Sequence, residues 1–287
     1  MISISPQELE RNADKKMNSW FFRQTSFDEA GDMFFKAANK YKIQRMFVES
    51  GKAFEKAADS YKKCGRIFDD VAQQYLEAAK AYKTVNHEDY VRCQEKAIDI
   101  EKQGGSMNRA AGHLMELAKV REGAGDFDGA IKNYTESCEL YQIDDKNRSA
   151  RRCQEQLAII YSLHKKNYLK ASELFETLGR SKLEESISRF NAKECWFKAC
   201  ICHLMTKDRN SVRDKLRSYE EMDPSLSDSY EKKLIESLCE AVDEADEVKS
   251  SAAVSNYDSV HRPDPWKTQM LLRLKDDIHK DDENSDL

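Results

Sequence analysis

Proline and glycine are both scarce in this chain. Its 287 residues include four prolines, none of them between residues 7 and 223, and ten glycines. A β-sheet protein of this length needs many tight turns, and such turns favour Gly, Pro or Asn. Hydrophobic residues make up 40% of the chain, against about 45–50% in ordinary globular domains. The composition therefore excludes one thick core and predicts an all-α fold, in which many helices each bury a narrow apolar stripe.

Long hydrophobic runs and an excess of positive charge are also missing. No stretch of about 18 apolar residues is present to span a membrane, and residues 1–16 contain no signal-peptide core. The formal net charge is -5, so nucleic acid is not an expected partner. The excess acid lies at the C-terminal end. These features predict a cytoplasmic protein, peripheral to membranes, whose eight cysteines are reduced.

Signatures of catalysis are absent as well. The patterns GxxxxGK[ST], HExxH, GxSxG and GxGxxG do not occur, and no set of nucleophile, base and orienting group can be assembled. The sequence therefore predicts neither an enzyme nor a bound cofactor. Cys195, Cys200, Cys202 and His203 fit no CxxC pair and fall within one helical segment, which directs their side chains apart. We expect a packed helix there and no metal site.

The chain does contain a repeat. An aromatic residue, two further residues, Ala-Ala, two more residues and Tyr follow one another in FFKAANKY from Phe34, FEKAADSY from Phe54 and YLEAAKAY from Tyr75. Degenerate copies begin at residues 93, 113, 134 and 154, so the copies are 18 to 21 residues apart. Within each copy the residues at i, i+3, i+4 and i+7 lie on one helical face. Each copy is therefore one helix, and two copies make an antiparallel hairpin.

A period of about 40 residues per helix pair is typical of an α-solenoid, whose hairpins must stack to bury their stripes. We predict a twisted solenoid of tetratricopeptide-like (TPR-like) antiparallel hairpins over residues 1–220, including an N-terminal helix and an aromatic loop over residues 18–25. A C-terminal helical bundle over residues 221–280, whose last helix begins at Pro265, and an acidic tail over residues 281–287 follow. A TPR-type co-chaperone or a scaffold subunit of a larger assembly is the alternative function.

Three stretches in the C-terminal third carry a resemblance to a known family. They are NAKECWFKACICHL (191–204), SYEEMDPSLSDSYEKKL (218–234) and NYDSVHRPDPWKTQMLLRLKDDI (256–278), and an acidic end follows them. With these stretches in this order, the chain resembles the soluble N-ethylmaleimide-sensitive factor attachment proteins (SNAP family), and the alpha type in particular.

The resemblance implies an adaptor without chemistry of its own. Several copies, each monomeric when free, would wrap an assembled SNARE four-helix bundle of the syntaxin type. They would then recruit a hexameric AAA+ ATPase, the N-ethylmaleimide-sensitive factor (NSF), which pulls the bundle apart. This activity would serve vesicle transport, including ER–Golgi transport, and membrane fusion on the cytosolic face of membranes.

A membrane contact is predicted at Trp20, Phe21 and Phe22. Three consecutive large aromatics in a loop have no helical period that would bury them all. Aromatic side chains favour the bilayer interface, and the nearby Lys16 and Arg23 suit anionic headgroups. The family is similar in having a Phe-Phe pair in this loop, whereas Trp20 and the lack of flanking glycines depart from its pattern.

The resemblance places the SNARE-binding surface on basic residues. Arg152, beside Arg151, and Lys193 match positions at which the family has bundle-contacting lysines. Because assembled SNARE bundles are acidic outside, the resemblance implies a long-range attraction that added salt weakens. Three positions depart from the family's basic pattern, and these are Gly112, Gln156 and Tyr230.

The resemblance places the ATPase-binding surface on acidic residues near the C-terminus, together with one leucine. These residues are Glu240, Asp243, Glu244, Asp282, Glu283, Asp286 and Leu287. The family has its matching leucine next to last, whereas Leu287 is terminal here and carries its own carboxylate. A lone leucine after an acidic run suits a pocket on a basic partner.

Overall fold

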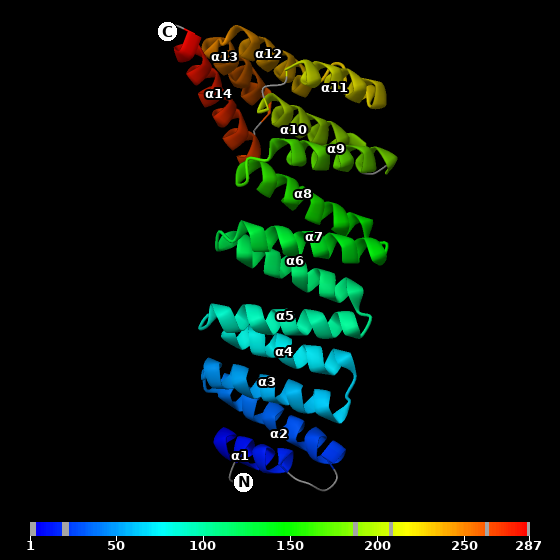
Figure 1. Ribbon diagram of the computed structural model, residues 1–287, viewed down its shortest axis with the longest axis vertical. Helices are drawn as coiled ribbons and strands as arrows, with labels where there is room; N and C mark the ends of the chain where they lie inside the picture. The colour runs from blue at the N-terminus through cyan, green and yellow to red at the C-terminus, as the bar shows by residue number, and fades with distance from the viewer. Residues whose placement is uncertain (1–3, 19–22, 186–188, 207–208, 262–263, 286–287) are drawn as a thin grey trace. The chain divides into compact units, whose positions relative to one another are not determined.

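The computed structural model describes residues 4–18, 23–185, 189–206, 209–261 and 264–285. These ranges contain helices and short connections and no strand, which confirms the predicted all-α class (Figure 1). The chain forms two compact units, residues 1–150 (unit 1) and residues 151–287 (unit 2). The boundary between them falls within one helix, α8 (Asn147–Leu163).

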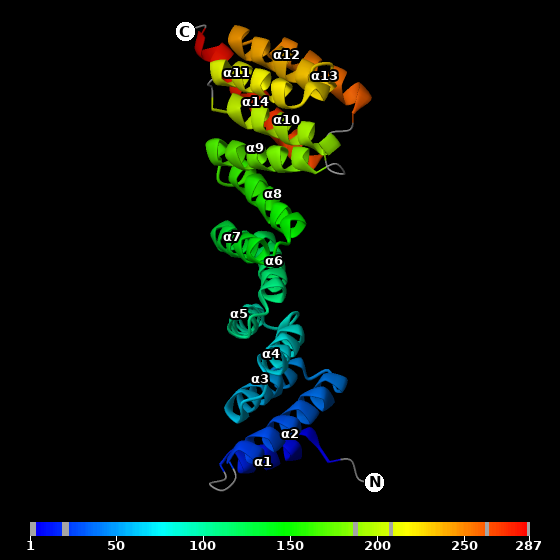
Figure 2. The same cartoon turned by 90° about the vertical axis from the view of Figure 1, so that its right-hand side faces the viewer.

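Unit 1 is a stack of antiparallel helix hairpins of the TPR-like solenoid type, and Figure 2 shows the stack in a turned view. The unit contains α1 (Pro6–Met17), α2 (Arg23–Ile43), α3 (Phe47–Cys64), α4 (Phe68–Tyr82), α5 (His87–Gln103), α6 (Met107–Gly123) and α7 (Phe127–Ile143), followed by the first residues of α8. From α1 to α6, each helix packs on the helix that follows it in the sequence.

The repeated phrase forms the seams between these helices. Its alanines at positions 37, 38, 57, 58, 78 and 79 are fully buried. Gly31 and Gly51, each three residues before a phrase, make room for the rings of Tyr61 and Tyr82 on the next helix. A Cβ atom at either glycine would lie 2.4 Å from the ring. The predicted core role of the repeat is confirmed, and the α2–α3 and α3–α4 seams each additionally place a glycine opposite a tyrosine ring.

Unit 2 closes into a bundle around α10. It continues α8 and contains α9 (Tyr168–Glu184), a 3₁₀ turn η1 (Arg189–Asn191), α10 (Ala192–Leu204), α11 (Arg209–Met222), a second 3₁₀ turn η2 (Pro224–Leu226), α12 (Tyr230–Glu244), α13 (Glu247–Val260) and α14 (Pro265–Ser285). Besides its sequence neighbours, α10 contacts α12 and α14. Trp196 of α10 is fully buried and stacks on Tyr219 of α11, with ring centroids 4.6 Å apart.

The bounds of the aromatic loop and of the C-terminal tail differ from those expected. The aromatic loop was expected over residues 18–25, but α2 already begins at Arg23. Its first turn is held in place because the Gln24 side-chain amide donates a hydrogen bond to the carbonyl of Cys64, at 2.9 Å. At the other end of the chain, α14 continues through Ser285, since no Gly or Pro between residues 266 and 285 stops it. The expected boundary near residue 220 stays a prediction.

Candidate partner-binding surfaces

Several predicted contact residues fall outside the described ranges, namely Trp20, Phe21, Phe22, Asp286 and Leu287. Asp282 and Glu283 lie in the last turns of α14, where the backbone alone is described. The surfaces that the structure does describe are therefore the basic residues at the starts of α8 and α10 and the acidic residues at the end of α12.

The basic residues of unit 2 gather at one edge of the unit. Because successive helices run antiparallel, the start of α8, the end of α9 and the start of α10 lie at this edge (Figure 1). Arg151 donates hydrogen bonds to both carboxylate oxygens of Glu185 at 2.7 Å and to Ser181 Oγ at 3.1 Å. The backbone carbonyl of Glu185 in turn accepts a hydrogen bond from the N–H of Arg189. Glu185 therefore ties the start of α8 to the turn before α10.

Arg151 and Arg152 consequently differ in what they offer a partner. The Arg151 side chain is only 13% exposed and is occupied by Glu185. Arg152 is exposed and has no ion pair among the described residues. Lys193 is 39% exposed and lies 3.8 Å from the buried carboxylate of Glu231 on α12, a distance longer than a hydrogen bond. Arg152 and Lys193 thus present charge to solvent, whereas Arg151 positions the edge.

The edge also contains two residues that were not among the predicted contact residues. Arg189 and Phe190 are exposed residues of η1, and Phe190 is 79% exposed. Phe190 therefore adds an exposed aromatic side chain to the basic edge. The signal in the sequence was an aromatic residue that follows a cation and falls outside the phase of the repeat.

Glu240, Asp243 and Glu244 lie on the last two turns of α12, as neighbours on one helical face. The ammonium of Lys249 on α13 lies 2.8 Å from Glu240 and 3.2 Å from Glu244. Arg213 of α11 pairs with Asp243. The side chains of Glu240 and Glu244 remain 57% and 58% exposed, so their outer oxygens can still receive donors from a partner.

The acidic surface extends past the predicted residues. Asp246 accepts a hydrogen bond from the N–H of Lys249 and so caps the start of α13. Glu247 lies 3.2 Å from Lys275 and 3.0 Å from His279 on α14. These contacts join the acidic end of α12 to the helix that carries the C-terminal acids.

The charge of unit 2 reverses along its sequence. Residues 151–215 contain 14 Lys and Arg against 8 Asp and Glu, whereas residues 216–287 contain 9 against 19. Helix α14 is fixed to the basic half by buried contacts. The Trp266 indole donates to Ser162 Oγ at 2.8 Å, and Lys267 lies 2.8 Å from Glu194. The apolar stripe of α14, which comprises Trp266, Met270, Leu271, Leu274 and Ile278, is buried.

A buried carboxylate holds α9, α10 and α11 together beneath these surfaces. Glu176, 6% exposed, receives hydrogen bonds at 2.8 Å from Lys215 and Tyr219 and lies 3.1 Å from His203 Nε2. Burial alone would raise the pKa of Glu176, but these three partners lower it to about 2. His203 therefore has a structural partner. Cys195, Cys200, Cys202 and His203 are all buried in α10. No metal-binding cluster occurs among the residues that the structure describes.

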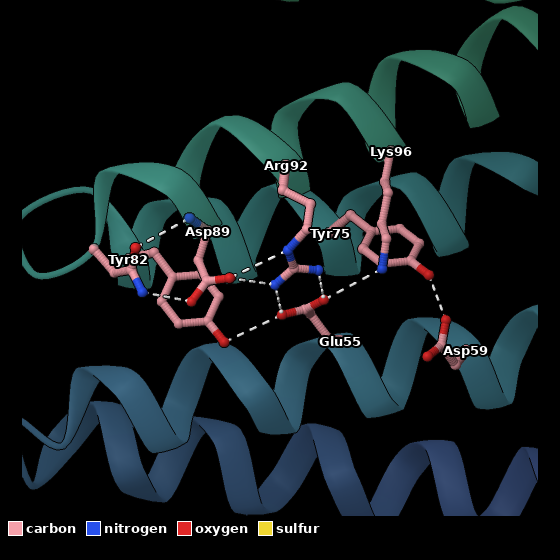
Figure 3. Close-up of polar contacts among 8 residues, drawn as sticks. Glu55, Asp59, Tyr75, Tyr82, Asp89, Arg92 and Lys96 are labelled. Atoms are coloured by element: carbon pink, nitrogen blue, oxygen red, sulfur yellow. Dashed lines mark hydrogen bonds and ion pairs between the residues drawn. The ribbon is translucent and has the colours of Figure 1, made fainter.

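In unit 1, the side chains of Arg92 and Lys96 form ion pairs with acidic residues (Figure 3). Arg92 of α5 donates to Glu55 of α3 at 2.7 Å and to Asp89 at 2.6 Å. The ammonium of Lys96 lies 3.4 Å from the Glu55 carboxylate. The Tyr82 hydroxyl donates a hydrogen bond to the same carboxylate at 3.1 Å. This network locks α3 to α5 across α4 and neutralises the face that carries it.

The three departures from the family's basic pattern are occupied in different ways. Gly112 lies on α6 near Tyr141, whose hydroxyl would be 3.5 Å from a Cβ there. Gln156 is half-buried on α8. Tyr230 is 49% exposed at the start of α12 and packs against the ring of His261. Arg109, three residues before Gly112 on α6, forms an ion pair with Asp69 and is therefore already engaged within unit 1.

Stacked helical hairpins of this kind define a helical-repeat protein. A family model described as soluble NSF attachment protein, SNAP, matches residues 4–279. The chain belongs to the SNAP family, whose members act as NSF attachment proteins in vesicular fusion and are not enzymes.

Relatives from plants, animals and fungi match nearly the whole chain. The alpha-soluble NSF attachment protein of Vitis vinifera is 31% identical over 98% of this chain and 97% of its own length. The beta-soluble NSF attachment protein of Bos taurus is 34% identical, with 92% and 88% covered. The vesicular-fusion protein SEC17 of Komagataella phaffii is 31% identical, with 96% of each chain covered. Among solved structures, BtubC (BKLC) from P. vanneervenii covers 78% of this chain and 92% of its own, with 12% identity and a TM-score of 0.41.

No helix in the described part of the chain is both long and apolar enough to cross a membrane.

Proposed function

We propose that this protein attaches NSF, a hexameric AAA+ ATPase, to assembled SNARE four-helix bundles, so that ATP hydrolysis disassembles them. It acts at the cytosolic face of membranes, monomeric when free and in several copies per bundle. The observation that carries the proposal is the charge reversal within unit 2, where a basic edge and an acidic end are built into one unit. An adaptor between an acidic bundle and a basic ATPase surface needs both.

The basic edge is the proposed SNARE surface. Arg152 and Lys193 supply exposed charge, and Arg151 holds the edge in place through Glu185. Each exposed ion pair with a partner contributes about 1 kcal/mol or less at physiological salt. Affinity therefore comes from several such contacts and from several copies, and it falls as salt is added.

The acidic end is the proposed ATPase surface. Glu240, Asp243 and Glu244 recruit the ATPase, and the C-terminal Asp282, Glu283, Asp286 and Leu287 extend this surface. Leu287 acts after recruitment, since one apolar side chain at the end of an acidic segment adds little affinity but suits a pocket. Removal of Leu287 should leave SNARE binding unchanged and lower stimulated ATP hydrolysis.

The membrane contact at Trp20, Phe21 and Phe22 belongs to the same proposal. Replacement of all three by Ser should weaken binding to vesicles and leave binding to a soluble SNARE bundle nearly intact. A collapse of thermal stability would instead show that these aromatics belong to the core.

Reconstituted disassembly tests the proposed function. A purified SNARE bundle, NSF and ATP are mixed with or without this protein, and release of the separated SNARE chains is followed over time. We expect release only when the protein is present. Reversal of Arg152 and Lys193 to Glu should slow it strongly, whereas reversal of Lys52 and Lys132, two exposed lysines of unit 1, should slow it little. Release that does not depend on the protein would contradict the proposal.

A further inference from the structure

Unit 1 exposes two isoleucines at the edge opposite the connection between α1 and α2. Ile43, the last residue of α2, is 82% exposed, and Ile4, just before α1, is 47% exposed. Both lie at the same end of the hairpin that α1 and α2 form, because the ammonium of Lys40, three residues before Ile43, donates a hydrogen bond to the carbonyl of Ile4. Single exposed apolar residues are common on proteins, but two exposed isoleucines at the same end of one hairpin need an explanation.

Two cations lie next to Ile43 in the sequence. Lys42 and Arg45 are exposed, and no acidic residue occurs between Lys40 and Val48. Lys42 lies 3.0 Å from Glu77, while the Arg45 side chain has no ion pair among the described residues. Arg45 has a φ of 60°, a left-handed turn conformation that is unusual for arginine. The turn thus holds a cation beside Ile43 at some conformational cost.

We propose that Ile4, Ile43, Lys42 and Arg45 form an N-terminal patch that binds an anionic lipid surface. Apolar side chains on a turn enter the bilayer interface without needing a complementary pocket, while the cations meet anionic headgroups. A protein partner would need a shaped surface of matching acids, whereas a bilayer accepts two protruding side chains. The inference rests on the proposed function for the presence of a membrane.

The patch lies at one end of the hairpin that α1 and α2 form. α2 has 21 residues, which corresponds to about 31 Å at 1.5 Å per residue. The connection at residues 19–22 follows the end of α1, whereas the patch lies at the start of α1 and the end of α2 (Figure 1). Peripheral anchoring generally requires two weak signals acting together, and the patch would supply one of them.

Vesicle flotation tests the patch. The full-length protein is floated with phosphatidylcholine vesicles that contain or lack phosphatidylserine. The variant Ile4→Ser/Ile43→Ser is compared with Ile67→Ser/Ile143→Ser, in which two isoleucines elsewhere in unit 1, 67% and 68% exposed, receive the same change. We expect the patch variant to bind phosphatidylserine vesicles about tenfold more weakly, since two apolar side chains no longer enter the interface, and the control variant to bind like the unchanged protein.

Arg45→Asn supplies a second test, because asparagine tolerates the left-handed conformation and removes only the charge. It should reduce binding to phosphatidylserine vesicles several-fold at low salt and have no effect on phosphatidylcholine vesicles. Equal binding of the patch and control variants would overturn the inference. So would a patch variant that loses binding to a soluble SNARE bundle, which would identify the patch as a protein contact.

The aromatic-loop variant separates this inference from the proposed function. If Trp20, Phe21 and Phe22 changed to Ser abolish flotation while the patch variant floats normally, the proposed membrane contact stands and the patch is refuted. If SNARE disassembly fails with the unchanged protein but flotation depends on Ile4 and Ile43, the proposed function fails and the lipid contact stands.

Discussion

Unit 1 and unit 2 differ in the kinds of side chain that they bury. Unit 1 buries alanine seams, with tyrosine rings seated on glycines, and pairs its cations at half-exposed positions such as Arg92. Unit 2 buries two tryptophans and several charged groups, including Lys198, Lys267 and Glu176. The difference teaches that the repeats depend on small residues along their seams, whereas the bundle adds large aromatic side chains and buried ion pairs that fix which helices meet.

Truncation of the bundle core should have the largest effect. Trp196→Ala removes a fully buried ring that stacks on Tyr219 and covers Gly179, and we expect a loss of about 3–5 kcal/mol in the free energy of unfolding. Chemical denaturation followed by circular dichroism measures it. Phe190→Ala in the same unit is the control, since Phe190 is 79% exposed, and it should change stability by less than about 0.5 kcal/mol. Similar losses in both variants would refute the contrast between buried and exposed aromatics.

Filling a seam of unit 1 should have the next largest effect. In Gly51→Ala the new Cβ would lie 2.4 Å from the Tyr82 ring, so the two helices must separate, at a cost of about 1–3 kcal/mol. Gly123→Ala places the same methyl group where nothing lies within 4 Å, and it should stabilise α6 by about 0.5–1 kcal/mol. Hydrogen exchange of α3 and α4 measures the first change locally. Two effects of the same sign would show that close approach at the seam is not what Gly51 provides.

A further expected effect depends on pH. Glu101 of α5 is 1% exposed, and one of its oxygens is buried without a hydrogen-bond partner. Burial raises the pKa of Glu101 to about 7. Because the folded state retains this proton where the unfolded state has lost it, the contribution of Glu101 to stability falls as pH rises from about 4.5 to 7. Glu101→Gln should therefore stabilise the protein more at pH 8 than at pH 5, and thermal melts at both pH values would show it.

Glu176 in unit 2 gives the opposite comparison. Its partners lower its pKa to about 2 from the ordinary 4.5, so its contribution is present above about pH 4.5 and is lost as pH falls toward 2. Parallel pH profiles for the Gln variants of Glu101 and Glu176 would contradict the assignment of one costly and one stabilising buried carboxylate.

Much of the fold could be predicted because it follows from local patterns. The near-20-residue spacing of FFKAANKY, FEKAADSY and YLEAAKAY fixes the length and buried face of each helix, and Pro265 marks the start of α14 as expected. The pairing of Gly51 with Tyr82 could not be predicted, since it joins residues 31 positions apart on different helices. The same holds for Glu176, whose partners come from α10 and α11.

The surfaces were predicted less completely than the fold. Exposure cannot be derived from residue type, so the sequence did not distinguish the occupied Arg151 from the exposed Arg152. Phe190 and Ile43 were not selected because a single apolar residue outside the repeat has no periodic signal. Only the structure shows which of them point into water.

The central claim is that unit 2 carries two separable surfaces, a basic edge for the SNARE bundle and an acidic end for the ATPase. An immobilised SNARE bundle is incubated with NSF under conditions that prevent ATP hydrolysis, and the amounts of this protein and of NSF retained are measured together. The variant Glu240→Gln/Asp243→Asn/Glu244→Gln should remain on the bundle and retain several-fold less NSF, with the deficit greatest at low salt, whereas Arg152→Glu/Lys193→Glu should lose both proteins. Full retention of NSF by the first variant, or its loss from the bundle, would contradict the account.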